Sequence, residues 1–400
     1  MPRIKKSEKT AERLILVRYG EIALKSEPVR HQHEKRLKEN ISAGMKEAKI
    51  KDFEIIKTRG RFFVKVAEKN MDKIFKVLAN IFGIVSFSPC WHLHTSDVKE
   101  IQKFIRANYA KWVTRKQSFA VRARRSEKQK GEYTSVQLAK LIGDVVNRKV
   151  NLSEPDVEIF VEVRGNDTYI YTKVLKGPGG MPVGTAGKVV CLMSGGIDSA
   201  VAAWLMMKRG CVVAMLYADN WPYISDKESS LKRIKDVLKV LQTWSAGWKI
   251  PIFSFDNGKN LKHFLESKSV PRKFVCLLCK RMMYRVANEL AGRLDAKAIV
   301  TGESLAEVAS QTLDNLAVLS EASALPVFRP LTGNDKQENI ELARRIGTYE
   351  KSISIKSICK AVPAAPRTKG KISELKDIES NLPIEKLLKE SLKSMVCLII

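Results

Sequence analysis

Residues 188–204 read KVVCLMSGGIDSAVAAW, and this stretch decides the fold of the C-terminal half of the chain. The apolar run 189–193 is typical of a buried strand, and the small apolar residues from Ala200 onward are typical of a helix. Gly195 and Gly196 lie between them and let the backbone approach a ligand closely. A helix that begins after such a turn directs free N–H groups and its dipole at an anion. The stretch therefore predicts a phosphate-binding loop.

The hexapeptide SGGIDS (194–199) differs from two common nucleotide motifs. A Walker A loop would continue with Gly-Lys-Ser/Thr, and a dinucleotide loop would read GxGxxG. Ser194 and Ser199 instead add hydroxyl donors beside the two glycines. A Gly-Gly turn alone is usually structural, but a complete hexapeptide between a strand and a helix favours phosphate binding.

The segments after this loop alternate between strand and helix patterns. Near-continuous Val/Ile/Leu strands between amphipathic helices are typical of a doubly wound parallel sheet with helices on both faces. The expected strands are 211–218, 251–255 and 296–302, and the expected helices are 200–210, 229–244 and 279–294. Beyond residue 366, two weakly amphipathic stretches predict short helices.

The N-terminal part has an α+β pattern. Strands at 13–20 and 61–67 and helices at 33–48 and 71–83 suit a small ferredoxin-like unit. A strand at 117–126, a helix at 134–148 and a hairpin over 157–175 that turns at Gly-Asn-Asp predict a second α+β unit. Residues 176–188 contain five glycines and two prolines, which indicates a linker or an ordered loop between domains.

The net charge of +28 is unevenly distributed. Residues 101–150 hold 13 Lys and Arg against 3 Asp and Glu, a local density that is typical of a nucleic-acid-binding surface. A solvated surface or a heat-adapted proteome would also explain the excess. Alternation along the strand 117–126 predicts that Arg122 and Arg124 point outward. The expected RNA contacts are Arg122, Arg124, Arg125, Lys128 and Lys130.

Length and composition narrow the class of protein. A chain of 400 residues is expected to form two or three domains. It has no apolar stretch of about 18 residues, and its charged N-terminus lacks the apolar core of a secretory signal. Seven scattered cysteines, an odd number, argue against a disulfide framework. We therefore expect a cytoplasmic protein that does not bind membranes.

The hexapeptide resembles the pyrophosphatase loop of ATP-dependent adenylating enzymes, a group that includes GMP synthetase, asparagine synthetase and the tRNA thiolases. This resemblance implies that ATP is cleaved between its α and β phosphates, leaving AMP on a substrate oxygen. It also implies a role for Asp198 in holding the Mg²⁺ ion that neutralises the pyrophosphate.

Further stretches resemble one member of this group, the tRNA 4-thiouridine synthetase (tRNA sulfurtransferase) family. They are RYGEIALKS (18–26), KRMM (280–283), TGES (301–304), VASQT (308–312) and FRPLTGNDKQENIELARRIGTYEKSIS (328–354). The similarity runs from about residue 14 to residue 366. It implies a ferredoxin-like domain (1–75), an RNA-binding THUMP domain (76–176), a PP-loop adenylating domain (177–366) and a helical tail (367–400).

The resemblance also implies a set of site residues. One departure is Ala306-Glu307, where the family usually has Gly-Gln. A cation at a helix start, as expected for Lys280, is unfavourable unless an anion is near, which supports its assignment independently. The implied ATP contacts are Leu192, Met193, Ser194, Gly195, Gly196, Ser199, Tyr217, Ala218, Lys280, Gly302 and Gln311.

Three of the cysteines have chemically informative positions: Cys276 and Cys279 in CLLC, and Cys359. The family implies sulfur transfer at the position of Cys359, and we expect no counterpart here of the rhodanese domain that many bacterial relatives carry. Three thiolates suit an iron–sulfur cluster in which one iron has no cysteine ligand and can bind sulfide. They suit zinc less well, because no fourth ligand is evident. A persulfide on Cys359, resolved by Cys276 or Cys279, is the competing scheme.

The expected function is ATP-dependent conversion of uridine 8 of tRNA to 4-thiouridine, with Asp198 and Cys359 as catalytic residues. The expected cofactors are ATP, Mg²⁺ and an iron–sulfur cluster. The expected partners are tRNA and a sulfur donor, either sulfide or an external persulfide, and a homodimer stays open. Alternatives are an adenylating sulfurtransferase for thiazole synthesis, a tRNA-binding protein without catalysis, and an enzyme that makes another thiolated base.

Overall fold

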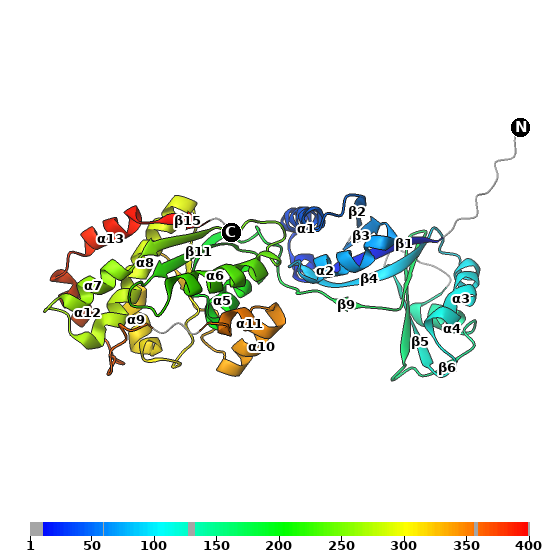
Figure 1. Ribbon diagram of the computed structural model, residues 1–400. Coiled ribbons are helices and arrows are strands. Elements are labelled where there is room, and N and C mark those ends of the chain that lie inside the picture. The colour runs from blue at the N-terminus through cyan, green and yellow to red at the C-terminus, as the bar shows by residue number, and fades with distance from the viewer. Residues whose placement is uncertain (1–10, 59, 127–132, 356–358, 399–400) are drawn as a thin grey trace, which may run out of the picture. The chain divides into compact units, whose positions relative to one another are not determined.

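The computed structural model describes residues 11–58, 60–126, 133–355 and 359–398. These residues form two compact units (Figure 1). One unit comprises residues 11–30, 44–79 and 83–179, and the other comprises residues 31–43, 80–82 and 180–398. Every helix in the described ranges is too short or too polar to span a bilayer.

The first half of the N-terminal unit has the expected ferredoxin-like order, strand–helix–strand–strand–helix–strand. Its strands pair in the order β2-β3-β1-β4, all antiparallel. The predicted helix over 71–83 ends at Ala79, because residues 80–83 form a turn that closes at Gly83, whose φ is +98°. The elements are β1 (Glu12–Tyr19), α1 (Glu27–Glu47), β2 (Phe53–Thr58), β3 (Arg61–Val66), α2 (Met71–Ala79) and β4 (Ile84–Leu93). Residues 31–43 of α1 are counted with the other unit. The predicted domain boundary after residue 75 falls inside α2.

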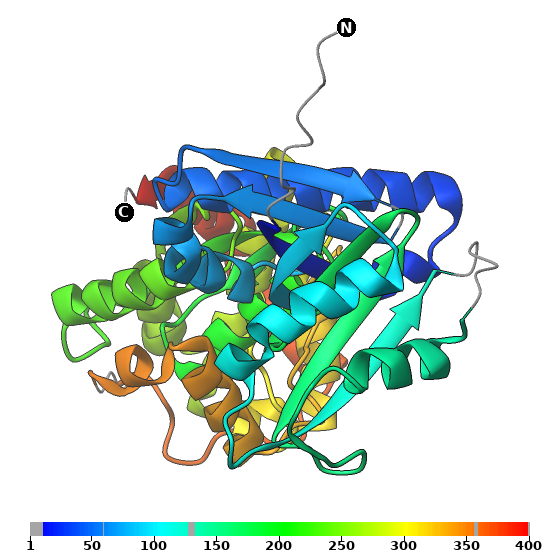
Figure 2. The same cartoon turned by 90° about the vertical axis from the view of Figure 1, so that its right-hand side faces the viewer.

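The second half extends the same sheet, because β4 pairs with β1 on one side and with β8 and β9 on the other. The predicted hairpin is β7–β8, with its turn at Gly165 and Asn166. Helices α3 and α4 cover this half through Ile101, Ile105, Leu138 and Ile142 (Figure 2). The elements are α3 (Val98–Trp112), β5 (Ser118–Arg125), α4 (Ser135–Gly143), β6 (Lys149–Val150), β7 (Val157–Arg164), β8 (Asp167–Tyr171) and β9 (Leu175–Lys176).

The glycine-rich segment 176–188 is an ordered loop. A Cβ atom on Gly177 would lie 2.3 Å from the carbonyl oxygen of Ile84, and one on Gly180 would lie 2.1 Å from that of Lys208. Gly180 and Gly184 also have φ values of +74° and +92°, which side chains rarely adopt. The segment therefore needs glycine for close packing as well as for its backbone conformation.

The C-terminal unit is the expected doubly wound sheet, in the order β14-β13-β10-β11-β12-β15. All neighbours are parallel except β15, which pairs antiparallel with β12. Both β15 and the short β14 were not predicted from sequence. The strands are β10 (Lys188–Leu192), β11 (Val212–Asp219), β12 (Ile252–Asp256), β13 (Ile299–Val300), β14 (Val327–Phe328) and β15 (Val396–Leu398).

Helices cover both faces of this sheet (Figure 1). Alternate residues of β10 point to opposite cores, with Val189 and Cys191 in one and Val190 in the other. The first face carries α5 (Ile197–Lys208), α6 (Lys227–Gln242), α10 (Lys336–Ile346) and α11 (Tyr349–Ile353). The second carries α7 (Gly258–Glu266), α8 (Val275–Leu294), α9 (Leu313–Glu321), α12 (Ile372–Ser380) and α13 (Ile384–Lys393).

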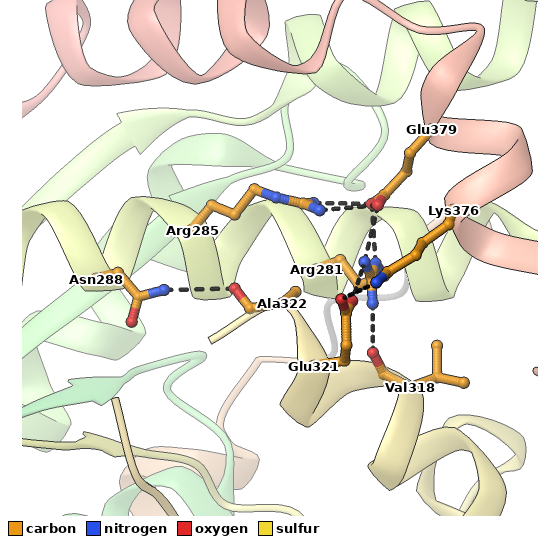
Figure 3. A network of polar contacts seen from close by, with 8 residues as sticks. All are labelled: Arg281, Arg285, Asn288, Val318, Glu321, Ala322, Lys376 and Glu379. Atoms are coloured by element: carbon orange, nitrogen blue, oxygen red, sulfur yellow. Dashed lines mark hydrogen bonds and ion pairs between the residues drawn. The ribbon is translucent and has the colours of Figure 1, made fainter. Parts of the chain in front are cut away.

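An ion-pair network fastens the C-terminal tail to α8 (Figure 3). Arg281, which is 1% exposed, donates from Nε and Nη2 to the two carboxylate oxygens of Glu379, both at 2.8 Å. Arg285 makes a second bidentate pair with the same carboxylate, also at 2.8 Å. Nη2 of Arg281 also donates to Glu321 at 2.7 Å, which adds α9 to the network. The tail thus completes the fold around the helix that carries Cys276, Cys279 and Lys280.

Candidate active site

The loop between β10 and α5 has the geometry of an anion site. Gly195 has a φ of +74°, and a Cβ atom there would meet Cγ1 of Ile234 at 2.8 Å. Helix α5 begins at Ile197, with Gly196 as its N-cap and no side-chain cap, so its first N–H groups are free for a ligand. The prediction placed this helix start near Ala200, so Asp198 and Ser199 lie in the first helical turn instead of the loop.

A cavity of about 380 Å³ opens beside this loop at the carboxyl ends of β10, β11 and β13. This is where open α/β sheets bind ligands. Gly195 forms the loop without lining the cavity, and Cys276 and Cys279 also lie outside its lining. The predicted residues that line it are Leu192, Met193, Ser194, Gly196, Asp198, Ser199, Tyr217, Ala218, Lys280, Gly302, Gln311 and Cys359.

Gly302 brings the end of β13 against the first turn of α5. A Cβ atom on Gly302 would lie 2.6 Å from both the carbonyl carbon of Asp198 and the nitrogen of Ser199. Because both contacts are to backbone, no side-chain movement could relieve them. Glycine is therefore required here by packing.

Lys280 lies in the second turn of α8, which begins at Val275, so the prediction of a helix start at residue 279 was wrong. The actual N-terminus of α8 precedes the CLLC sequence because Phe274 and Val275 are buried in the same core. The anion near Lys280 is a protein group, since its Nζ donates to Oε1 of Glu303 at 2.9 Å.

Glu303 is the centre of a buried cluster that sequence reasoning missed. Tyr284, Thr301 and Arg329 donate to its Oε2 at 2.7, 3.0 and 2.9 Å. Burial alone would raise the pKa of Glu303, but the charge of Lys280, hydrogen bonds from Tyr284 and Lys280, and the charge of Arg329 lower it to about 2. We call Glu303, Lys280, Tyr284, Thr301 and Arg329 the Glu303 cluster. Its residues come from helix α8 and from the segments that follow β13 and β14, a grouping that their sequence separation conceals.

Asp198 has a cationic partner in the structure. Lys336 Nζ lies 2.8 Å from Oδ2 of Asp198 and 2.6 Å from Oε1 of Glu307. Both residues that depart from the family pattern, Ala306 and Glu307, lie at this site. Ala306 has a φ of +63°, where glycine is normally favoured. Glu307 forms an ion pair with Lys336 beside the one that Lys336 makes with Asp198.

Two other cavity residues have polar atoms without partners. Arg233 donates to the carbonyl oxygens of Ile355 and Ser194 at 2.7 and 3.1 Å, while its buried Nε has no hydrogen-bond partner in the described part of the chain. The buried Oε1 of Gln311 is also without a partner there. A ligand that carries phosphate and an amino group would satisfy both. Arg233 was not predicted as a site residue, because the sequence pattern of an amphipathic helix places its arginines on the surface.

The cysteines lie in two kinds of environment. Cys359 lines the cavity, whereas Cys279 is buried and accepts a hydrogen bond from Asn257 at 3.2 Å. Burial, with the nearby Cys359, raises the pKa of Cys276, and burial raises that of Cys279 to about 12. Within the described residues, the three sulfur atoms do not all lie within 4.8 Å of one another. A mononuclear zinc ion would need them about 3.8 Å apart, whereas a cluster spaces its thiolates more widely because they bind different irons.

The predicted RNA-binding arginines lie on β5, while Lys128 and Lys130 lie outside the described residues. Arg122 is half-buried and donates to Glu158 at 2.7 Å and to the carbonyl oxygen of Leu152 at 2.8 Å. Arg124 is exposed, and Arg125 donates to the carbonyl oxygen of Tyr133. Arg122 and Arg124 line a second cavity of about 960 Å³ between β5 and α4.

Three family models match the chain in succession. The ThiI ferredoxin-like domain matches residues 14–88, the THUMP domain matches 95–173, and the family described as "Thiamine biosynthesis protein (ThiI)" matches 184–384. A "Probable tRNA sulfurtransferase" of Methanosarcina acetivorans is 39% identical over 391 residues, which are 96% of this chain and 92% of the relative. A relative of the same description from Saccharolobus islandicus is 39% identical and covers 94% of this chain and 98% of its own length.

Solved structures agree with these matches to family models and relatives. The crystal structure of a 4-thiouridine synthetase–RNA complex with bound ATP is 31% identical, with a TM-score of 0.84, and covers 97% of this chain and all of the other. A structure of PH1313 from Pyrococcus horikoshii is 26% identical, with a TM-score of 0.66, and covers 84% of this chain and 99% of its own. The loop, the cavity and these similarities together show that the chain belongs to the ThiI family of tRNA sulfurtransferases.

Proposed function

We propose that this protein uses ATP to convert uridine 8 of tRNA to 4-thiouridine. The observation that carries the proposal is that Cys359 and the phosphate loop line one cavity. Activation of a nucleobase and transfer of sulfur require both groups at the same reacting carbon. The relatives named tRNA sulfurtransferase and 4-thiouridine synthetase support this reaction class.

The cavity residues fit ATP. The uncapped N-terminus of α5, with Ser194 and Gly196, would accept the phosphates, and Arg233 would neutralise part of their charge. Gln311 offers an acceptor oxygen for the adenine amino group. Leu192, Met193, Tyr217 and Ala218 supply apolar surface for the base.

Asp198 would hold Mg²⁺ at the phosphates. Its carboxylate lines the cavity and is bound by Lys336, whose side chain is 45% exposed and can move away when the ion enters. Bound Mg²⁺ would supply positive charge to the leaving pyrophosphate. The Glu303 cluster keeps Lys280 fixed at the cavity wall, where it completes the cationic side.

The reaction then has two balanced steps. Uridine O4 attacks the α-phosphorus of ATP, the bond to the β-phosphate oxygen breaks, and pyrophosphate leaves. A sulfur nucleophile then bonds to C4, the C4–O4 bond breaks, and AMP departs with that oxygen. The adenylate makes O4 a good leaving group, which an unmodified carbonyl oxygen is not.

Two sulfur routes fit the cysteines. An iron–sulfur cluster held by Cys276, Cys279 and Cys359 would supply an iron with a free position for sulfide, and the hydrogen bond from Asn257 to Cys279 is of the kind that supports a cluster ligand. In the alternative, a donor leaves a persulfide on Cys359, and its outer sulfur bonds to C4 as AMP leaves. The thiolate of Cys276 or Cys279 then attacks Sγ of Cys359, which breaks the S–S bond, leaves the outer sulfur on C4 and forms a disulfide with Cys359. That disulfide must be reduced by an external thiol before the next turnover.

RNA binding is proposed for the β5 surface. Arg124 is free to contact phosphate, and Arg125 lies beside it, whereas Arg122 already pairs with Glu158. Lys128 and Lys130 continue the same basic stretch in sequence.

Gly302→Ala tests the proposal, with Gly292→Ala as the matched control. In Gly302→Ala the added methyl group would lie 2.6 Å from the backbone of α5. In Gly292→Ala it would have no other atom within 4 Å. We expect Gly302→Ala to lose ATP binding and 4-thiouridine formation, measured with tRNA, ATP and sulfide, while Gly292→Ala retains both. Equal activity of the two variants would contradict the proposed site.

Sulfur donation to thiazole synthesis is a second candidate, favoured by the description of the matching family as a thiamine biosynthesis protein. It would use the same cavity but not the basic β5 surface. A variant that loses tRNA binding yet still supports thiazole sulfuration would separate the two activities.

A further inference from the structure

The N-terminal unit carries a cluster of histidine and carboxylate side chains with no part in the proposed reaction. Strand register places Glu12 opposite His92 and His92 opposite Tyr169, so these side chains share one face of the sheet. His94 follows the last residue of β4 and Asp167 begins β8, and Nδ1 of His94 lies 3.4 Å from Oδ1 of Asp167. The ligand atoms of Glu12, His92 and His94 all lie within 4.8 Å of one another.

The ring of His92 is fixed in position and in tautomer. It stacks on Tyr169 with ring centroids 4.7 Å apart and planes 14° apart. Its Nε2 lies 2.7 Å from Oδ1 of Asp167, and because a carboxylate only accepts, the proton belongs on Nε2. This is how a carboxylate orients a histidine that binds a metal through its other nitrogen.

The other nitrogen of His92 makes no hydrogen bond among the described residues. The residue is 8% exposed, and its buried Nδ1 makes no hydrogen bond in the described part of the chain. The nearest acidic atom, Oε2 of Glu12, lies 3.7 Å away, which is too far for a proton to join the two atoms. Two electron-pair donors therefore face each other with a gap that a metal ion would fill.

We propose that Glu12, His92 and His94 bind a divalent transition-metal ion of the zinc class. Two imidazoles with one carboxylate favour such an ion over Mg²⁺ or Ca²⁺, which prefer oxygen ligands. Tetrahedral zinc holds its ligand atoms about 3.4 Å apart, and the half-exposed His94 can rotate to reach this spacing. Oε1 of Glu12 is bound by Lys65, which leaves Oε2 for the ion.

The ion would fasten β1 to β4 and, through Asp167, to β8. These strands join the ferredoxin-like half of the sheet to the THUMP half, so metal binding would stabilise that junction. The site lies in a different unit from the cysteines and does not depend on the proposed function.

Cobalt titration of the full chain tests the proposal. The protein is stripped with a chelator, and Cys276, Cys279 and Cys359 are replaced by alanine to remove competing thiolates. We expect one Co²⁺ per chain, with visible absorption but without thiolate charge-transfer bands, and displacement by Zn²⁺. The unsubstituted chain serves as a second measurement, because sulfur-bound and nitrogen-bound cobalt differ in these spectra.

Variants locate the ion. Asp167→Asn should weaken binding about 10- to 100-fold, because it removes the group that fixes the His92 tautomer. His94→Asn should weaken it further, and since His94 is 48% exposed the variant should still fold. His263→Asn, an exposed histidine on α7, is the control and should bind as the parent does. A chain that binds cobalt no more tightly than its folded His94→Asn variant would overturn the proposal.

Discussion

The two sides of the nucleotide cavity differ in how much of their polar chemistry the protein satisfies by itself. Glu303 accepts four hydrogen bonds, from Lys280, Tyr284, Thr301 and Arg329. On the side of the phosphate loop, the α5 N-terminus has no side-chain cap, and Arg233 Nε and Gln311 Oε1 have no partner among the described residues. The first side is therefore built for stability, and the second is prepared for a ligand.

The comparison predicts its largest effect for Glu303→Ala. Removal of the carboxylate leaves Lys280 and Arg329 as unpaired cations in a buried site, which should lower the free energy of unfolding by about 3–5 kcal/mol. Urea denaturation measures this loss. Glu341→Ala, an exposed residue on α10, is the control and should change stability by no more than about 0.5 kcal/mol. Equal stability of the two variants would contradict the claim that the Glu303 side of the cavity stabilises the fold.

The pH dependence of stability should show the same cluster. Because the folded-state pKa of Glu303 is lowered from 4.5 to about 2, its stabilisation is present above pH 4.5 and is lost as the pH falls toward 2. The shift corresponds to about 3 kcal/mol. Between pH 6 and pH 3, the midpoint temperature of thermal unfolding should therefore fall more steeply for the parent than for Glu303→Gln. Parallel curves would assign the acid sensitivity to other carboxylates.

Arg233→Ala should affect binding more than stability. Loss of a charged hydrogen bond to phosphate costs about 1.5–3 kcal/mol, which weakens ATP binding about 10- to 100-fold. Calorimetric titration measures the affinity, and Lys232→Ala, the exposed neighbour on α6, should leave it unchanged. Unchanged affinity in Arg233→Ala would contradict the assignment of Arg233 to the phosphates of ATP.

The smallest effect concerns the two arginines on β5. Arg124 is exposed, whereas Arg122 is bound by Glu158, so the same distinction between free and satisfied groups applies. Arg124→Ala should reduce the slope of log affinity for tRNA against log salt by about 0.7–0.9, and Arg122→Ala should reduce it less. Filter binding at several salt concentrations checks the order, and the reverse order would contradict this assignment of the surface.

Local patterns predicted the parts of the fold that local residues determine. The sequence 188–204 predicted a strand, a loop and a helix, and all three are present, although α5 begins at Ile197. Strands β2 and β4 and helix α3 were not predicted. In β4, Pro89 argues against a central strand, but it lies between the residues that pair with β8 and those that pair with β9. The missing N–H group therefore interrupts no pairing on that side.

The candidate site was predicted where a motif carries it and missed where tertiary structure does. Most residues implied by family resemblance line one cavity, as that resemblance requires. Glu303, Arg233 and Lys336 were missed because most of their partners are far away in sequence. Lys336 and Asp198, for example, are 138 positions apart. Their roles depend on which groups remain unpaired after folding, and no local pattern records this.

The most direct test of the central claim is a single-turnover reaction of Cys359→Ala with tRNA, ATP and sulfur donor. Pyrophosphate and 4-thiouridine are measured in the same sample. If one cavity activates the uridine and receives the sulfur, the variant should release pyrophosphate at the parent rate but form no 4-thiouridine. Formation of 4-thiouridine at the parent rate would contradict the account.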